Sequence, residues 1–484
     1  MNAHRRAKIV CTLGPATSSA ERIGQLIDAG MNVARLNLSH GERAQHQVLL
    51  EQVRSESKKR GLYVALLADL QGPKIRLGKL VPGEHELKEG ATFIITTDEI
   101  IGDSTRASTT YKGLARDCAA GDALLIDDGK VTLQISKISG NEIFTIVRNG
   151  GAISSNKGIN APGSSLSVPA LSDKDVTDLE WALEAGVDLI ALSFVRSASD
   201  INLVHAVMDK SKKGLRIPVI AKIEKPQAVS NLDEIVAAFD GLMVARGDLG
   251  VELPIEEVPL VQKRCIISAR ENAKPVIVAT QMLDSMINQP SPTRAEATDC
   301  ANAILDGADA LMLSGETSVG KFPLEAVATM SRIIAKTEEK ALSEVAQLRH
   351  NPHTKAGAIT KAAAEVGAVV GAKFLVAFTQ SGDSARRMSR LRSVIPILAL
   401  TPELSTAHQL ALSWGVEPIL IPPAKHTDEM VKQIDSSLLD TARASVGEYI
   451  VIVAGSPPGI PGSTNAMRVH RVGDAVAGIA PAYR

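Results

Sequence analysis

Eight short apolar segments, each followed by an amphipathic stretch, repeat along the first two thirds of the chain. They begin at Lys8, Met31, Leu62, Asp188, Ile217, Gly241, Pro275 and Ala310. Six of the seven start-to-start spacings lie between 23 and 35 residues. Strand–helix alternation with this period is typical of βα units around a parallel sheet. Eight such units predict a (β/α)8 barrel, and a doubly wound open sheet with the same alternation is the alternative.

The one exceptional spacing, 126 residues between the third and fourth segments, points to an insertion. Residues 72–168 have a different texture, with Gly/Asp turn signals between alternating runs such as ATFIITT, VTLQISKI and EIFTIV. Such runs are typical of β-hairpins. The sequence therefore predicts a barrel from residues 1–71 and 169–348 and an inserted all-β domain at 72–168.

A third region follows the eighth unit. Residues 349–355 read as a linker, and beyond them four apolar runs alternate with helical stretches: KFLVAFT, IPILAL, VEPILI and EYIVIVAG. We expect a C-terminal α/β domain over residues 349–484.

The composition of the chain argues against nucleic acids and membranes as binding partners. The 484 residues carry a net charge of −1 and only 3% aromatic side chains, which argues against a nucleic-acid binder. No stretch reaches the 18 apolar residues of a membrane helix, and the N-terminus lacks a signal-peptide pattern. The four cysteines are scattered, as is typical of reduced thiols: Cys11, Cys118, Cys265 and Cys300. We expect a cytoplasmic protein without nucleic-acid or membrane partners.

Polar residues recur where the barrel strands end, although buried parallel strands are normally apolar. They are Arg35, Asn37 and Ser39, then Asp69, Lys222 and Glu224, Arg246 and Asp248, Thr280, and Ser314 with Glu316. Any one of them is most simply a turn former or helix cap. Together, at strand ends that meet on one face of a barrel, they predict an active site.

The residue types at these strand ends indicate the chemistry. Glu224 and Asp248 supply the hard oxygen ligands that suit Mg²⁺ or Mn²⁺, and no histidine lies among them. Arg35, Arg76, Lys222 and Arg246 add cations, which together with a metal suit a phosphorylated substrate. The residues alone leave open metal-assisted phosphoryl transfer or phosphometabolite binding.

Eight segments then resemble the pyruvate kinase family, in family order over residues 8 to about 323. They are KIVCTLGPAT, GMNVARLNLSHG, DLQGPKIR, SNKGIN, AKIEKPQAV, MVARGDLGVELP, ATQMLDSM with PTRAEATD, and LMLSGETSVGKFP. The resemblance implies the last step of glycolysis, in which phosphoenolpyruvate and ADP give pyruvate and ATP. It also implies that the inserted domain is a mobile lid.

The resemblance assigns roles around the reacting phosphoryl group. Arg35 would contact the substrate phosphate, and Lys222 would stabilise the phosphoryl group in flight. Glu224 and Asp248 would hold the divalent metal. The amides of Gly247 and Asp248 would bind the substrate carboxylate, which Thr280 would orient.

Further roles implied by the resemblance concern the nucleotide and the proton. Arg76 and Lys157, on either side of the insert, would reach the nucleotide phosphates when the lid closes, and Asn37 would belong to the nucleotide site. Ser314 and Glu316 are the candidates for relaying a proton to the enolate.

The sequence departs from the family at its monovalent site. Asn37, Ser39 and Asp69 match ligands that hold K⁺ in many members, but Leu70 replaces a threonine and Lys74 replaces a glutamate. Because the Lys74 ammonium is itself a fixed monovalent cation, we expect activity without K⁺.

The C-terminal region carries a phosphate-cradle pattern at Thr379, Ser381, Gly382 and Ser384, before a predicted helix. An ordinary helix cap is the alternative. The Gly/Pro-rich residues 455–465 are a second candidate loop, or a plain connector. Resemblance suggests a homotetramer with a phosphorylated allosteric effector, a sugar phosphate or nucleotide monophosphate.

Two other functions would share some of these residues. A metal-dependent barrel lyase acting on pyruvate or oxaloacetate would use Glu224 and Asp248 but would have no use for Arg76, Lys157 or a lid. A non-catalytic phosphometabolite sensor would not need Lys222 or Thr280.

Overall fold

The eight apolar segments form eight parallel strands that close into a barrel. The computed structural model describes residues 5–164, 166–211, 214–346, 348, 352–460 and 462–478. The barrel strands are β1 (Lys8–Thr12), β2 (Val33–Asn37), β3 (Ala65–Asp69), β12 (Leu189–Leu192), β13 (Val219–Ile223), β14 (Gly241–Ala245), β15 (Val276–Ala279) and β16 (Ala310–Leu313). Their order around the barrel is β1-β16-β15-β14-β13-β12-β3-β2. The barrel prediction is confirmed, and the open-sheet alternative is wrong.

Alternation along each strand builds two apolar layers, because successive side chains point to opposite faces. One set fills the barrel interior and includes Val10, Val33, Leu67, Ile220 and Met243. The other set packs outward against helices. The longer helices of the barrel region are α1 (Ala20–Ala29), α2 (Arg43–Lys59), α4 (Asp173–Ala185), α5 (Ile201–Lys210), α7 (Leu232–Ala238), α9 (Val258–Glu271), α10 (Arg294–Asp306) and α12 (Pro323–Ala341). Three other helices begin within three residues of the end of a barrel strand: α6 (Pro226–Ser230) after β13, α8 (Arg246–Glu252) after β14 and α11 (Gly315–Ser318) after β16.

The insertion between β3 and β12 is rich in sheet. Its strands are β4 (His85–Leu87), β5 (Thr92–Thr96), β6 (Arg106–Ser108), β7 (Ala123–Ile126), β8 (Val131–Ser139), β9 (Glu142–Asn149), β10 (Gly151–Ile153) and β11 (Ile159–Asn160). They form a six-stranded sheet, β11-β7-β8-β9-β5-β6, and a two-stranded one, β10-β4. The prediction of an inserted β domain is confirmed, and a four-residue helix, α3 (Leu114–Asp117), lies within it.

The C-terminal region is an α/β sheet with five strands. Its elements are α13 (Lys355–Val370), β17 (Phe374–Phe378), α14 (Asp383–Ser389), β18 (Ile397–Thr401), α15 (Leu404–Leu410), β19 (Val416–Leu420), α16 (Thr427–Asp440), β20 (Tyr449–Gly455) and β21 (Thr464–Arg471). The four predicted strands are confirmed, and antiparallel β21 is an addition at the sheet edge. Of the predicted linker, residues 349–351 lie outside the described residues.

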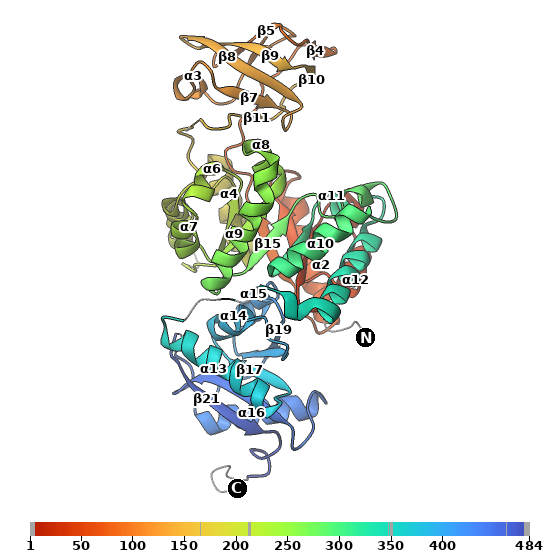
Figure 1. The fold of residues 1–484 in the computed structure, drawn as a ribbon, viewed down its shortest axis with the longest axis vertical. Helices are drawn as coiled ribbons and strands as arrows, with labels where there is room; N and C mark the ends of the chain where they lie inside the picture. Colours follow the sequence, from red (N-terminus) through yellow and green to blue (C-terminus); the bar gives the residue numbers. More distant parts are fainter. Residues whose placement is uncertain are drawn as a thin grey trace.

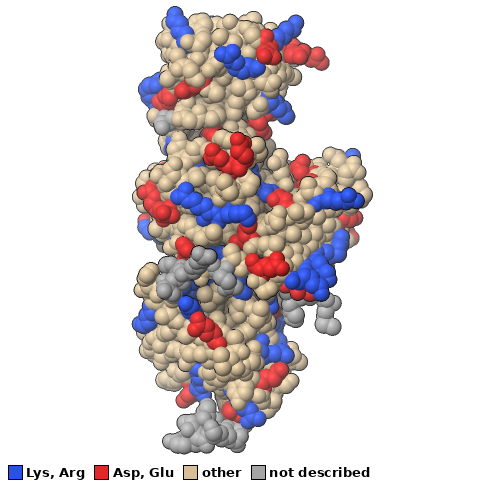
Figure 2. Space-filling model, in the orientation of Figure 1, with Lys and Arg blue, Asp and Glu red and all other residues tan. Residues whose placement is uncertain are grey.

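The three parts follow one another along the long axis of the molecule (Figure 1). The insert lies at one end next to α8, the barrel lies in the middle, and the C-terminal sheet lies at the other end beside α14 and α15. Figure 2 shows acidic and basic side chains interspersed over the visible face, in keeping with the net charge of −1. In the described part of the chain, no helix combines the length and the apolar character needed to cross a membrane.

Candidate active site

A chain of alternating charges lies buried at the carboxyl ends of β2, β3 and β13. Arg35 Nε donates to Asp69 Oδ2 at 2.6 Å, and Lys222 Nζ lies 3.3 Å from Asp69 Oδ1. Lys222 Nζ also lies 2.9 Å from Glu224 Oε1. Asp69 and Glu224 are each 1% exposed. The strand-end residues predicted to converge therefore do so at these four positions.

The neighbours of each group decide its charge. Burial opposes the charged form of Asp69, but Arg35 and Lys222 outweigh it and hold the pKa of this carboxyl below its usual value. Burial also opposes the charge of Lys222, yet Asp69 and Glu224 raise the pKa of this ammonium. The pKa of Glu224 is raised by burial and by Asp248, and Lys222 offsets only part of that rise. The site thus holds a permanent, buried ammonium ion.

Two residues that the sequence analysis missed complete this arrangement. Ser193 Oγ accepts a hydrogen bond from Lys222 Nζ at 2.7 Å and donates to the Leu70 carbonyl at 2.7 Å. The Phe194 amide donates to Glu224 Oε2 at 2.7 Å, from a backbone with φ of +56°. The signal was present, because Ser193 follows the apolar strand β12 just as Asp69 ends β3.

The carboxylates of Glu224 and Asp248 fit a divalent metal that would also be bound by oxygens of the substrate. Glu224 Oε1 is buried and pairs with the Lys222 ammonium at 2.9 Å, and Asp248 lies near enough to raise the pKa of Glu224. Among the residues that the structure describes, no cluster of three or more His, Cys, Asp and Glu side chains could hold a metal alone. Two carboxylates leave the remaining coordination positions to substrate oxygens and water, as is usual for Mg²⁺.

The turn from β14 into α8 places Gly247 against Thr280. Thr280 has a φ of +69°, and its Oγ1 accepts the Gly247 amide at 2.7 Å while donating to the Ala279 carbonyl at 2.6 Å. The Gly247 amide, predicted to bind a carboxylate, is thus bonded to the hydroxyl that was predicted to orient the same group.

Arg246 does not face the charged site, contrary to the expectation that it adds a cation there. Its guanidinium pairs with Asp299 at 2.7 Å and donates to the Thr280 carbonyl at 2.8 Å. In the alternation of β14, Arg246 follows Leu242 and Val244, which pack outward against helices, and not Met243, which fills the barrel interior. Arg246 positions Thr280 instead of contributing a free cation.

Ser314 and Glu316 lie at the start of α11. Glu316 Oε2 accepts the Ser314 amide at 2.7 Å, its Oε1 accepts the Leu283 amide at 3.1 Å, and burial raises the pKa of its carboxyl. Ser314 Oγ is buried and has no hydrogen-bond partner among the described residues. Glu316 therefore holds two loops in place, and Ser314 keeps an unused hydroxyl.

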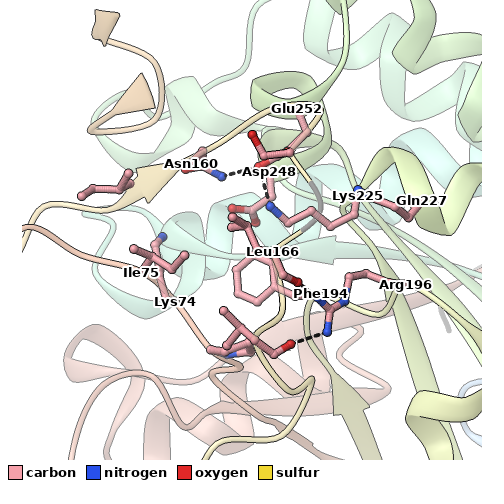
Figure 3. Close-up of a pocket in the computed structure, with 14 residues that line it drawn as sticks. Lys74, Ile75, Asn160, Leu166, Phe194, Arg196, Lys225, Gln227, Asp248 and Glu252 are labelled. Carbon is pink, nitrogen blue, oxygen red and sulfur yellow. Dashed lines mark hydrogen bonds and ion pairs between the residues drawn. The ribbon is translucent and has the colours of Figure 1, made fainter. Parts of the chain in front are cut away.

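A cavity of about 250 Å³ separates the barrel from the insert (Figure 3). Asp248, Phe194 and Lys74 all line it. Glu252 of α8 accepts hydrogen bonds from Asn160 of the insert at 2.7 Å and from Lys225 at 2.6 Å. This contact joins β11 of the insert to the barrel next to the charged site.

Arg76 and Lys157, the two cations predicted to bind the nucleotide phosphates, lie in the insert near the two points where it joins the barrel. Arg76 pairs through its backbone with Gly158, and its Nη1 donates to the Asn156 carbonyl at 3.0 Å. Lys157 Nζ forms an ion pair with Asp127 at 2.9 Å and is 37% exposed. The two residues therefore lie close together on the insert rather than in the barrel, Arg76 in an isolated backbone bridge and Lys157 in the loop between β10 and β11.

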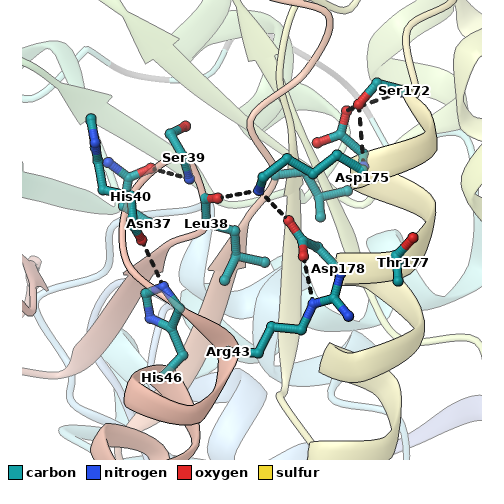
Figure 4. Close-up of polar contacts among 12 residues, drawn as sticks. Asn37, Leu38, Ser39, His40, Arg43, His46, Ser172, Asp175, Thr177 and Asp178 are labelled. Atoms are coloured by element: carbon teal, nitrogen blue, oxygen red, sulfur yellow. Dashed lines mark hydrogen bonds and ion pairs between the residues drawn. The ribbon is translucent and has the colours of Figure 1, made fainter.

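A second cavity, of about 760 Å³, opens beside Asn37 and His40 at the end of β2. The loop after β2 is fixed from α4, because Lys174 Nζ donates to the Leu38 carbonyl at 2.6 Å and to Asp178 at 2.5 Å (Figure 4). Asn37 Oδ1 accepts the Ser39 amide at 3.2 Å. Asp69, grouped with these two residues in the monovalent-site prediction, instead uses both carboxylate oxygens for Arg35 and Lys222.

The two candidate effector loops line one cavity. Thr379, Ser381 and Ser384 lie on one side of it, and Gly459 and Thr464 lie on the other. Ser384 Oγ lies 2.6 Å from Thr464 Oγ1, which joins the two loops directly. Gly382 has a φ of +80°, a conformation that favours glycine, and its amide donates to Thr379 Oγ1 at 3.0 Å. Asp383 lines the same cavity but pairs with Arg387 at 2.7 Å.

Comparison with known proteins gives a consistent result. Residues 4–327 match the family model described as pyruvate kinase, barrel domain, and residues 357–470 match the one described as pyruvate kinase, alpha/beta domain. Curated pyruvate kinases from Mycobacterium tuberculosis and Corynebacterium glutamicum are 57% and 55% identical to the chain over 470 residues. These alignments cover 97% of this chain and 99% and 98% of the relatives. The crystal structure of a pyruvate kinase from Cryptosporidium parvum, 36% identical, superposes with a TM-score of 0.90 over 97% of this chain and 96% of that one.

Proposed function

The chain belongs to the pyruvate kinase family and makes pyruvate and ATP from phosphoenolpyruvate and ADP, and we propose that the buried chain of charges around Lys222 carries out this transfer. The observation that supports this assignment is the ammonium of Lys222, held between Asp69 and Glu224 at the barrel mouth. A cation fixed before the reaction stabilises negative charge on a phosphoryl group without reorganising.

The neighbours of Lys222 bind and orient the substrate in this proposal. Arg35 binds the phosphate, and its bonds to Asp69 and to Thr12 Oγ1 at 3.0 Å hold its guanidinium in place. Thr280 and the amides of Gly247 and Asp248 receive the carboxylate, which would replace the Gly247–Thr280 hydrogen bond seen here. Ser314, with its unused buried hydroxyl, and Glu316 behind it form the proton-relay pair.

Pyruvate kinases generally use a divalent metal. We assign Glu224 and Asp248 as the residues that would hold Mg²⁺ or Mn²⁺, because both carboxylates lie at the site and are close enough for Asp248 to raise the pKa of Glu224. A divalent cation bound there supplies positive charge to the oxygens of the transferring group. We further propose that K⁺ is not required, since Lys74 lines the cavity beside Asp248 and can supply a monovalent charge.

The nucleotide belongs in the barrel cavity beside the end of β2 in this proposal, with the insert closing over it. Asn37 lines the 760 Å³ cavity, which is large enough for a nucleotide. Arg76 and Lys157 approach from the insert, and Lys157 would exchange its ion pair with Asp127 for a phosphate. Closure of the insert over the site would exclude water, which protects the phosphoryl group from hydrolysis.

The remaining assignments concern regulation and assembly. We propose that Thr379, Ser381, Gly382 and Ser384, with the loop at 455–464, bind a phosphorylated effector, because both loops line one cavity. A homotetramer is supported by exposed apolar side chains before and along α9, namely Ile255, Leu260 and Ile267. We also propose a cytoplasmic location and domains spanning residues 1–71 with 169–348, 72–168 and 349–484.

One coupled assay tests the reaction and its rivals. Purified protein with phosphoenolpyruvate, ADP and Mg²⁺ should form pyruvate, as followed by NADH consumption with lactate dehydrogenase. Omitting ADP, or adding excess EDTA, should abolish the signal. Pyruvate formed without ADP, or from oxaloacetate, would support the lyase alternative instead. Repeating the assay with ribose 5-phosphate, glucose 6-phosphate, fructose 1,6-bisphosphate and AMP identifies the effector.

A further inference from the structure

A small cavity lies at the opposite end of the barrel, where the barrel meets the C-terminal sheet. On the barrel side it is lined by the end of α9 and by the residues that precede β15 and β16: Arg270, Ala273, Lys274, Pro275 and Asp309. On the other side it is lined by α14 and the segments after it: Arg386, Ser389, Arg390, Arg392 and Ser413. Its free volume is about 10 Å³.

The charges around this cavity are strongly unbalanced. Five of the lining residues are cations, and Asp309 is the one lining residue with a carboxylate. Arg270 is 1% exposed, and Arg390 and Arg392 are each 6% exposed. Burial, with the charge of Arg392 beside it, lowers the pKa of Arg270 to about 9. Cations buried against one another without counter-charge destabilise a fold.

Asp309 cannot neutralise the whole group. Its Oδ2 accepts the Val276 amide at 3.1 Å and lies 3.0 Å from Arg392 Nη2, and its Oδ1 accepts the Trp414 amide at 3.1 Å. Both oxygens are thus bound to donors, and one of the five cations is paired with this carboxylate.

The other hydrogen bonds of the cations go to neutral oxygens, and Arg392 also lies over the Trp414 ring. Asp240 and Asp383, which do not line the cavity, offset part of the charge of Lys274 and Arg386. Arg270 Nη1 donates to the Ala346 carbonyl at 2.8 Å, and Arg390 Nη1 donates to the Glu271 carbonyl at 2.9 Å. Lys274 Nζ donates to the Val236 and Ala237 carbonyls. The Nε atoms of Arg270, Arg390 and Arg392 are buried and have no hydrogen-bond partner among the described residues. Positive charge and free N–H groups therefore remain at the cavity.

We propose that this cavity binds a single small inorganic anion of the size of chloride. An anion would balance the excess positive charge and would accept hydrogen bonds from the guanidinium N–H groups that have no partner. The free volume is about that of one water-sized sphere, which excludes a sugar phosphate or nucleotide. A monatomic anion such as chloride, slightly larger than water, enters with a small outward shift of the arginine side chains. The bound anion joins Arg270 and Lys274 of the barrel to Arg390 and Arg392 of the C-terminal region.

Bromide provides a direct test, because it resembles chloride and scatters anomalously. Crystals of the full chain grown or soaked in sodium bromide should show an anomalous peak among Arg270, Arg390 and Arg392. A cavity that holds only water, or bromide peaks confined to the molecular surface, would overturn the proposal. This test uses the unmodified protein and does not depend on any variant folding.

Thermal unfolding gives a second test. At equal ionic strength, sodium chloride should raise the Tm over sodium gluconate, whose anion is too large for the cavity, by about 2 °C or more. Arg390→Gln removes one lining charge and should abolish most of this difference. Arg387→Gln, on the same helix but outside the cavity, should retain it. Equal Tm values in the two salts for the unmodified protein would contradict the proposal.

Discussion

Lys222 is the residue on which the proposed chemistry depends most. Its ammonium touches two carboxylates and the Ser193 hydroxyl, so that it is fixed in position and remains charged although its side chain is only 12% exposed. Arg35, by contrast, is bound to Asp69 and Thr12 and is the residue that we propose to bind the substrate phosphate. The two cations share Asp69 but have separable roles.

Replacing Lys222 with alanine should therefore slow the chemical step more than it weakens binding. We expect Lys222→Ala to lower kcat by about 10²–10³-fold or more, with a much smaller change in the KM for phosphoenolpyruvate. Steady-state kinetics with the coupled assay measures both, and circular dichroism checks the fold. Lys336→Ala, which removes an exposed lysine paired with Glu339, is the control and should leave kcat unchanged. Near-normal turnover of Lys222→Ala would show that the role is wrongly assigned.

A second prediction at this scale concerns Lys74. The unmodified protein should be active in K⁺-free buffer, and Lys74→Glu should make kcat rise with added K⁺ by about tenfold or more, because the fixed cation is lost. Lys79→Glu, an equal change of charge on an exposed residue of the same segment, should stay independent of K⁺. A comparable K⁺ dependence in the unmodified protein would contradict the proposal.

At the scale of single elements, the position of a residue relative to the end of its strand explains whether its place in the site could be predicted. Lys222 and Asp69 lie within strands, where two-residue alternation gives the direction of a side chain. Arg246 lies one residue beyond β14, on the face of Leu242 and Val244 that packs outward, so its strand-end position alone does not bring it to the site. Ser193 follows β12 on the face of Leu189 and Ala191, which line the barrel interior, but it was missed because a serine after a strand is most often a turn former.

The contact between β11 and α8 gives a prediction about the insert. Asn160→Ala removes the hydrogen bond to Glu252, which is 7% exposed and would lose one of its two buried donors, at a cost of about 1–3 kcal/mol. We expect faster amide hydrogen exchange at β11 of the insert, measured by mass spectrometry. Asn149→Ala, whose amide bonds only within the insert, is the control. Unchanged exchange at residues 159–160 would mean that this contact does not hold the insert.

At the scale of the whole molecule, the number of parts could be predicted because strand spacing records an insertion directly. The contacts between those parts could not, since they join segments far apart in the chain. The two candidate effector loops, about 80 residues apart, meet through Ser384 and Thr464. Strand β21 adds an edge to a sheet whose other four strands were predicted from their apolar runs. The cation-lined cavity likewise takes residues from both regions.

Glu338 of α12 holds together the barrel, the segment that precedes β1 and the C-terminal region. Its Oε1 accepts the Ala7 amide at 2.7 Å and the Trp414 indole N–H at 3.2 Å, and its Oε2 accepts the Arg6 amide at 2.7 Å. All three groups donate hydrogen bonds to the two carboxylate oxygens. A glutamine at this position would therefore place its NH₂ group, itself a donor, against at least one of them.

Glu338→Gln should therefore destabilise the protein despite its nearly identical shape. Leaving one buried donor unsatisfied costs about 1–3 kcal/mol, which corresponds to a Tm lower by about 2–8 °C. Glu339→Gln, on the next residue and exposed to solvent, should change Tm by less than about 1 °C. Differential scanning calorimetry compares the two variants. Equal Tm values for both would show that the Glu338 carboxylate is not the group that holds the three segments together.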